Sequence, residues 1–176
     1  MTFVSTAIRA THLVTNAAWF GGSLMGAVGL NTAARQADSE RKQAEISGAG
    51  WETWGPVQGG AIALHLLSGL GIVIDNRRRT VSHAPTTTAV VLKTALTGAA
   101  LAATAAAYIN GQKLGDVRTG SNDAGQPVQE SARELEGRMR WLQWAVPATT
   151  GALLVSDAYL GEQQRGPAGL LDWARK

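Results

Sequence analysis

Four long intervals of the chain contain no Asp, Glu, Lys or Arg, and they restrict the possible folds more than any other feature of the sequence. In chain order these intervals hold 25, 22, 19 and 16 residues. A helix that crosses a lipid bilayer needs ~20 mostly apolar residues. The intervals therefore predict four membrane-spanning helices, at about residues 10–31, 55–74, 88–109 and 141–160.

A soluble, alanine-rich helical bundle is the alternative, since the mean hydropathy of the chain is only −0.03. The helices of a soluble bundle carry a polar stripe along one face. Residues 94–109 offer only threonine and tyrosine as polar side chains, so they do not form such a stripe. The low mean hydropathy instead reflects long polar segments between spans that are rich in alanine and glycine. We therefore predict a single all-α integral membrane domain, a four-transmembrane-helix bundle.

Most aromatic side chains sort to the two ends of the predicted spans. One end carries Trp51, Trp54, Tyr108, Trp141 and Trp144, and the other carries Phe3, Tyr159 and Trp173. Because Trp and Tyr favour the membrane–water interface, this sorting supports the membrane interpretation independently of hydropathy.

The basic residues predict an orientation in the plasma membrane. Seven Lys and Arg residues lie in the three shorter segments at one face, and Arg77, Arg78 and Arg79 closely follow the second span. Cytoplasmic loops are enriched in Lys and Arg. We therefore expect both termini in the cytoplasm and segments 32–54 and 110–140 outside. The three arginines are also candidates for binding anionic lipid headgroups, although we favour a role as determinants of topology.

Both outer segments contain signals for helices. Oppositely charged residues four positions apart support a helix, and Glu134 and Arg138 are such a pair. We expect the first helix to continue to about Ile46 and the fourth to begin at Pro127. The predicted fold thus has helical extensions on the non-cytoplasmic side.

Small residues at four-residue spacing mark the predicted packing faces. They are Gly22 and Gly26 in the first span, and Thr94, Gly98, Ala102 and Ala106 in the third. Helices in lipid associate through the close approach of such residues. We interpret both sets as packing within the bundle. Docking of a partner or of a second copy on the third span is the alternative.

Each span contributes one strongly polar candidate for function. They are Asn16, His65, Lys93 and Asp157. At a helical rise of ~1.5 Å per residue, all four fall in the cytoplasmic half of the membrane and are expected to form one cluster. Ionisable groups inside a bilayer are functional candidates by default. The alternatives are a structural ion pair, a hydrogen-bonded packing histidine, or side chains that extend to the surface.

The histidines of the first two spans make haem a candidate cofactor. The two axial ligands of a haem must lie at the same depth in the membrane. The helical rise places His12 ~3 Å and His65 ~13 Å from the cytoplasmic edge. This mismatch argues against haem. Copper favours clusters of Met or His, which the spans lack, and His83 is isolated in a loop. We expect no cofactor and no bound metal.

A short motif in the first span provides a resemblance. His12-Leu13-Val14 and Trp19-Phe20-Gly21-Gly22 combine a histidine, six residues and Trp-x-Gly. This pattern resembles the opening helix of bacterial four-helix membrane proteins, such as the copper-resistance CopD-like family. The resemblance implies a four-helix membrane fold in a bacterium. It does not imply a metal role, because the further membrane histidines and methionines of those families are largely missing.

The sequence offers little catalytic chemistry. Cysteine is absent, which excludes disulfide, iron–sulfur and thiol sites. We also find no nucleotide-binding or nucleophile motif. We therefore predict a non-catalytic accessory or structural subunit of a larger membrane complex, with membrane lipids and other membrane subunits or itself as partners and no nucleic acid. One alternative is a small channel or carrier that uses the predicted cluster of Asn16, His65, Lys93 and Asp157. The other is a membrane redox protein.

Overall fold

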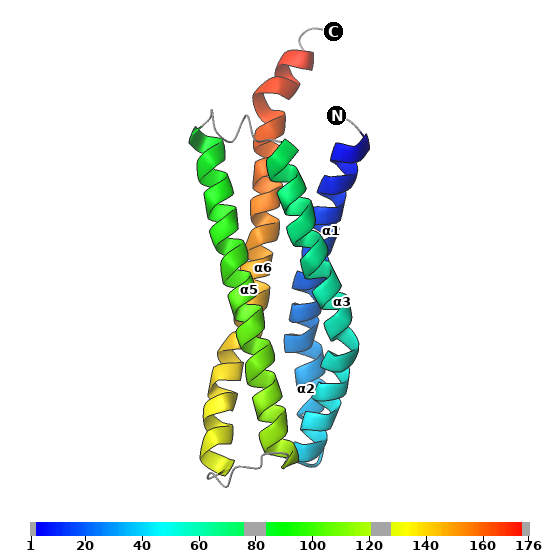
Figure 1. Ribbon diagram of the computed structural model, residues 1–176, viewed down its shortest axis with the longest axis vertical. Coiled ribbons are helices and arrows are strands. Elements are labelled where there is room, and N and C mark those ends of the chain that lie inside the picture. Colours follow the sequence, from blue (N-terminus) through cyan, green and yellow to red (C-terminus); the bar gives the residue numbers. More distant parts are fainter. Residues whose placement is uncertain (1–2, 76–83, 121–127, 174–176) are drawn as a thin grey trace.

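The computed structural model describes residues 3–75, 84–120 and 128–173, and these residues form helices without any strand. Their side chains are described for 3–74, 88–120 and 132–159. The helices are α1 (Phe3–Met25), α2 (Asn31–Ala34), α3 (Glu40–Asp75), α5 (Ala84–Thr119) and α6 (Val128–Trp173), and a π-helical turn (Gly26–Leu30) joins α1 to α2 (Figure 1). The all-α prediction is confirmed.

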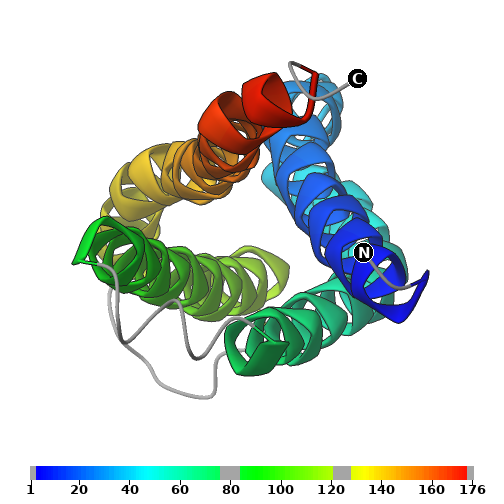
Figure 2. The ribbon, with the colours of Figure 1, turned by 90° about the horizontal axis from the view of Figure 1, so that it is seen from above.

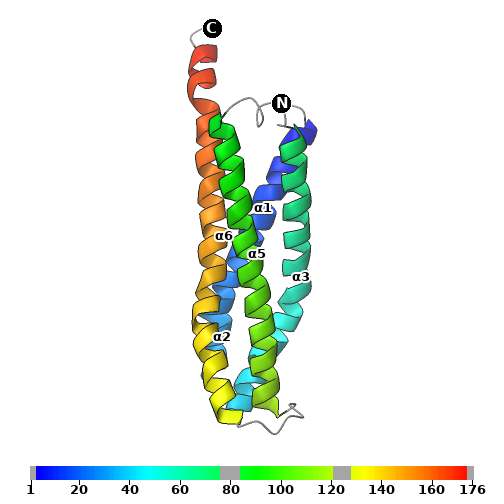
Figure 3. The ribbon, with the colours of Figure 1, turned by 60° about the vertical axis from the view of Figure 1, so that its left-hand side comes forward.

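The four long helices run alternately up and down and form a ring (Figures 2 and 3). Helix α1 packs against α3 and α6, and α5 packs against the same two helices. The backbones of the diagonal pairs, α1 with α5 and α3 with α6, do not approach one another. The first turn of α1 and the last turns of α6 lie at the same end of the bundle, which we call the terminal end.

Three of these helices are long and apolar enough to cross a membrane within the described residues. They comprise Phe3–Ala34, Glu40–Ile74 and Thr88–Thr119. The described part of α6 is less apolar because it contains Gln143, Pro147 and Asp157. Large apolar side chains, including Leu67 and Leu92, are exposed on the outside, whereas the buried residues include eight polar ones. Apolar side chains outside and polar ones inside are the distribution expected of a bundle in lipid.

The first helix does not continue to Ile46, contrary to the sequence prediction. The chain turns at residues 35–39, and α3 begins at Glu40. The Ser39 hydroxyl accepts a hydrogen bond from the backbone N–H of Lys42 at 3.3 Å, so it caps the new helix. Helices α3, α5 and α6 do extend beyond the predicted spans at the end opposite the termini.

Gly22 and Gly26 are packing glycines, as predicted, and their partners are tryptophan rings. A Cβ atom at Gly22 would collide with the side chain of Trp54, and one at Gly26 would collide with that of Trp51. Two rings that the sequence assigned to the membrane interface thus also fill the contact between α1 and α3. The missing side chains of the glycines allow this close approach.

The small residues of α5 do not pack within the bundle, so that prediction is wrong. Thr94, Gly98, Ala102 and Ala106 are all exposed, and a Cβ atom at Gly98 would meet nothing within 4 Å. Helix α5 instead turns another face inward, on which Ala100 is fully buried. A four-residue repeat identifies a face of the helix, but it does not determine which neighbour the face meets.

Candidate functional site

The interior of the bundle is lined by matching stripes on α1 and α6. The buried positions of α1 include His12, Asn16, Trp19 and Ser23, and those of α6 include Val146, Thr150 and Leu153, with the mostly buried Asp157 one turn further on. Both stripes follow spacings of three and four residues, which keep side chains on one face of a helix. Because the two helices are antiparallel neighbours, the start of one stripe lies beside the end of the other.

His12 and His65 form a reciprocal pair between α1 and α3. Their rings stack with centroids 3.9 Å apart and an interplanar angle of 16°. His12 Nδ1 lies 3.0 Å from the backbone oxygen of His65, and His65 Nδ1 lies 3.2 Å from that of His12. A carbonyl oxygen only accepts hydrogen bonds, so each Nδ1 carries a proton and donates it. The Nε2 atom of each neutral ring is then left as an acceptor.

Lys93 connects this pair to α6. Its ammonium group forms an ion pair with the carboxylate of Asp157 and lies 3.3 Å from His12 Nε2. The side chains of Lys93 and Asp157 are only 21% and 16% exposed. Hydrogen bonds and one ion pair thus join all four long helices, and Lys93 bridges the diagonal between α1 and α5. We call His12, His65, Lys93 and Asp157 the polar cluster.

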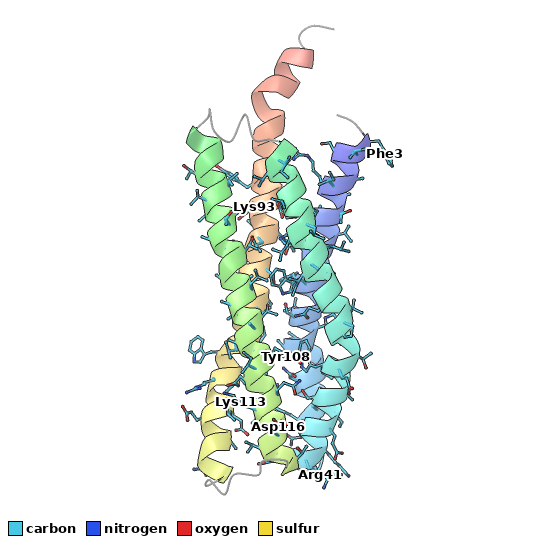
Figure 4. All side chains as sticks on the ribbon, in the orientation of Figure 1. Phe3, Arg41, Lys93, Tyr108, Lys113 and Asp116 are labelled. Carbon is cyan, nitrogen blue, oxygen red and sulfur yellow. The ribbon has the colours of Figure 1, made fainter. Side chains whose placement is uncertain are left out.

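Three of the four residues that the sequence singled out belong to this cluster. His65, Lys93 and Asp157 are brought together through His12, which sequence reasoning had not included. Figure 4 places Lys93 toward the terminal end of the bundle. The sequence could have assigned His12 to the cluster, because His12 lies four residues before Asn16 and therefore on the same helix face.

Asn16 is fully buried but makes no hydrogen bond to the cluster. Neither atom of its side-chain amide has a hydrogen-bond partner in the part of the chain that the structure describes. The Oδ2 atom of Asp157 is also buried and has no hydrogen-bond partner among the described residues. Buried polar atoms almost always have partners, so these atoms stand out within the bundle.

An apolar layer lies beside the polar cluster, toward the end opposite the termini. It consists of Trp19, Ala100, Val146 and Leu153, all buried. The indole of Trp19 meets the His65 ring edge-on, with centroids 6.1 Å apart, and donates to Thr104 Oγ1 at 3.1 Å. Among the described residues, a layer of mostly apolar side chains therefore separates the cluster from the opposite end.

The predicted difference in depth between His12 and His65 is wrong, since their rings are in contact. The predicted depth of His12 was counted from residue 10, whereas α1 begins at Phe3, so His12 lies further from the start of its helix than expected. The stack nevertheless does not resemble axial ligation, because axial ligands direct ring nitrogens at an iron between them. Among the described residues, no three His, Cys, Asp or Glu side chains form a group that could hold a metal ion.

Some predicted residues lie outside the described part of the chain, namely Arg77, Arg78, Arg79 and His83. Comparisons with known proteins add no assignment: no family model, no curated protein and no solved structure matches the chain.

Proposed function

We propose that the chain is a four-span integral membrane protein that moves protons through the polar cluster. The proposal is carried by one observation, the connected series Asp157, Lys93 and His12, which three different helices contribute. Ionisable groups within a bilayer are costly and commonly mark proton or ion pathways. Sequence alone favours a structural subunit, but the convergence of these groups favours transport.

In this proposal α6 is the fourth span, because it supplies the carboxylate of the cluster. Four spans return the chain to its starting side, in accordance with the shared terminal end of α1 and α6. The distribution of Lys and Arg assigns that side to the cytoplasm. The cluster then faces the cytoplasm, and the layer around Trp19 separates it from the outside.

Proton transfer within the cluster needs no large movement. Lys93 Nζ already donates toward His12 Nε2, so a transferred proton leaves a neutral amine and forms an imidazolium. The carboxylate of Asp157 lies beside the amine and stabilises a positive charge on either group. Release to the outside requires the Trp19 layer to move, so the protein works as a carrier with alternating access rather than as an open pore.

Proton flux into liposomes tests this function. We expect the purified protein to dissipate a pH gradient, reported by an enclosed pH-sensitive dye, faster than protein-free liposomes do. Asp157→Asn removes one proton-accepting group and should lower the rate by roughly a hundredfold, the low end for a lost proton-transfer group. Asp38→Asn is the control, because Asp38 is an exposed carboxylate paired with Lys42. A wild-type rate equal to that of empty liposomes would overturn the proposal.

A second candidate function, a non-catalytic subunit of a larger membrane assembly, also has support. No residue in the described ranges covers the exposed stripe from Thr94 to Ala106 on α5, and there is open space at Gly98. In lipid, such a stripe permits close approach of another helix. The two functions are compatible, since a proton-carrying subunit can belong to a larger complex.

Gly98→Leu tests the subunit role. A leucine at the centre of the stripe should weaken association by about 1–3 kcal/mol, the usual cost of overpacking a close contact. Gly21→Leu is the control, because Gly21 is also exposed with open space around it. The measurement is native mass spectrometry of protein extracted from its own membrane in mild detergent. Equal complex formation by both variants would exclude the stripe as an interface.

A further inference from the structure

A surface pocket lies between α5 and α6 near the end of the bundle opposite the termini. Its volume is about 210 Å³. The pocket is lined by Ala106, Ile109, Asn110 and Lys113 from α5, and by Leu135, Arg138 and Leu142 from α6. Asn110 donates a hydrogen bond to the backbone oxygen of Leu135 at 2.8 Å, which fixes the two helices at this point.

The lining changes in polarity along the bundle axis. Ala106 and Leu142 lie toward the middle of the bundle, and Lys113 follows Ala106 by seven residues, a rise of about 10 Å. Figure 4 places Lys113 further from the terminal end than Tyr108. Trp141 directly precedes the lining residue Leu142 in α6 and is 82% exposed. Exposed aromatic side chains mark the membrane–water interface, so the apolar part of the pocket points into the membrane and its cationic part points toward water.

We propose that this pocket binds an anionic phospholipid, with its phosphate at Lys113 and Arg138 and its acyl chain against Ala106 and Leu142. A phosphate is a strong acceptor for ammonium and guanidinium donors. Lys113 makes no ion pair with any residue that the structure describes. Within the described residues, the one ion pair of Arg138 is with Glu134, at 2.5 Å and on an exposed helix face. Exposed pairs of this kind are weak, so the guanidinium is available to a phosphate.

The inference does not depend on proton transport, because the pocket shares no residue with the polar cluster. The test uses the full-length protein in detergent, with phosphatidylglycerol and phosphatidylcholine as probes. Native mass spectrometry should detect retained phosphatidylglycerol, and the thermal unfolding temperature should rise with it more than with phosphatidylcholine. Lys113→Gln/Arg138→Gln should weaken phosphatidylglycerol binding about tenfold or more, because charge-assisted hydrogen bonds are lost.

Arg41→Gln/Lys42→Gln is the matched control. It removes two positive charges at the same end of the bundle, from exposed residues of α3 (Figure 4). A second variant, Ala106→Leu, fills the apolar part of the pocket without changing charge and should also reduce binding. Equal loss in the control, undiminished binding in Ala106→Leu, or equal binding of phosphatidylcholine would overturn the proposal. A temperature rise that inorganic phosphate reproduces would identify a site for soluble anions instead.

Discussion

Lys93→Met is expected to destabilise the folded bundle by about 3–5 kcal/mol, the cost of leaving one partner of a buried ion pair without the other. Asp157 would keep its carboxylate inside the bundle, with one oxygen already lacking a partner. His12 would also lose the donor to its Nε2 atom. The free energy of unfolding in detergent, followed by the helical circular dichroism signal, measures this effect.

The double variant Lys93→Met/Asp157→Leu should recover most of the lost stability. Replacing a buried ion pair by apolar side chains of similar size is often neutral or stabilising. A double-mutant cycle then separates the interaction between the two groups from the effect of each substitution. Arg41→Met is the control, because the exposed pair of Arg41 with Glu45 is worth about 0.3–0.5 kcal/mol.

The double variant also separates the structural role of the pair from its transport role. If the ion pair only fastens α5 to α6, the recovered bundle retains every property of the wild type. If the pair carries protons, the recovered bundle no longer dissipates a pH gradient. A double variant that is both stable and fully active would exclude the proposed proton series. Wild-type stability of Lys93→Met alone would show that Asp157 has another partner.

The sequence was sufficient to predict the all-helical fold, because the charge-free intervals are long enough for helices that could cross a bilayer. The cost of a charge in lipid limits where Arg, Lys, Asp and Glu can stand. Three of the predicted spans coincide with helices that are long and apolar enough to cross a membrane. The turn before Glu40 was missed because ion pairs such as Asp38 with Lys42 support any helix and do not show where it begins.

The polar cluster could be predicted only in part, because a depth along one helix does not fix the height of its neighbour. Lys93 and Asp157 were placed together correctly, since opposite charges within a bundle attract strongly at low dielectric. The contact of His12 with His65 depends on how far α1 slides along α3. Trp51 and Trp54 pack against glycines of α1 and so contribute to this offset. The spacing of residues in the sequence does not predict it.

Asn16→Leu is expected to increase the free energy of unfolding, in contrast to most substitutions in a bundle interior. The wild-type amide is completely buried, and neither its oxygen nor its nitrogen has a partner in the described structure. Each such unpaired group costs about 1–3 kcal/mol, so removal of both should yield ~3 kcal/mol. Leucine has the same number of side-chain heavy atoms with the same branching, and it adds no polar atom.

Asn110→Leu is the matched control, with the opposite sign expected. Asn110 is also buried, but its amide nitrogen donates to the backbone oxygen of Leu135 at 2.8 Å. Loss of that bond should cost about 1 kcal/mol. Destabilisation by both variants would mean that Asn16 has a partner in the membrane after all.

If Asn16→Leu stabilises the bundle, the wild-type amide lowers the stability of the fold, and a functional role would explain its presence. Proteins commonly sacrifice stability at sites where activity needs a polar or strained group. Asn16 lies one turn from His12 and one turn from Trp19 along α1, where a proton leaving the cluster would pass under the proposed transport function. We therefore expect the more stable variant to carry protons more slowly than the wild type in the liposome assay. Stabilisation without a loss of flux would leave Asn16 outside the pathway and confine transfer to Asp157, Lys93 and His12.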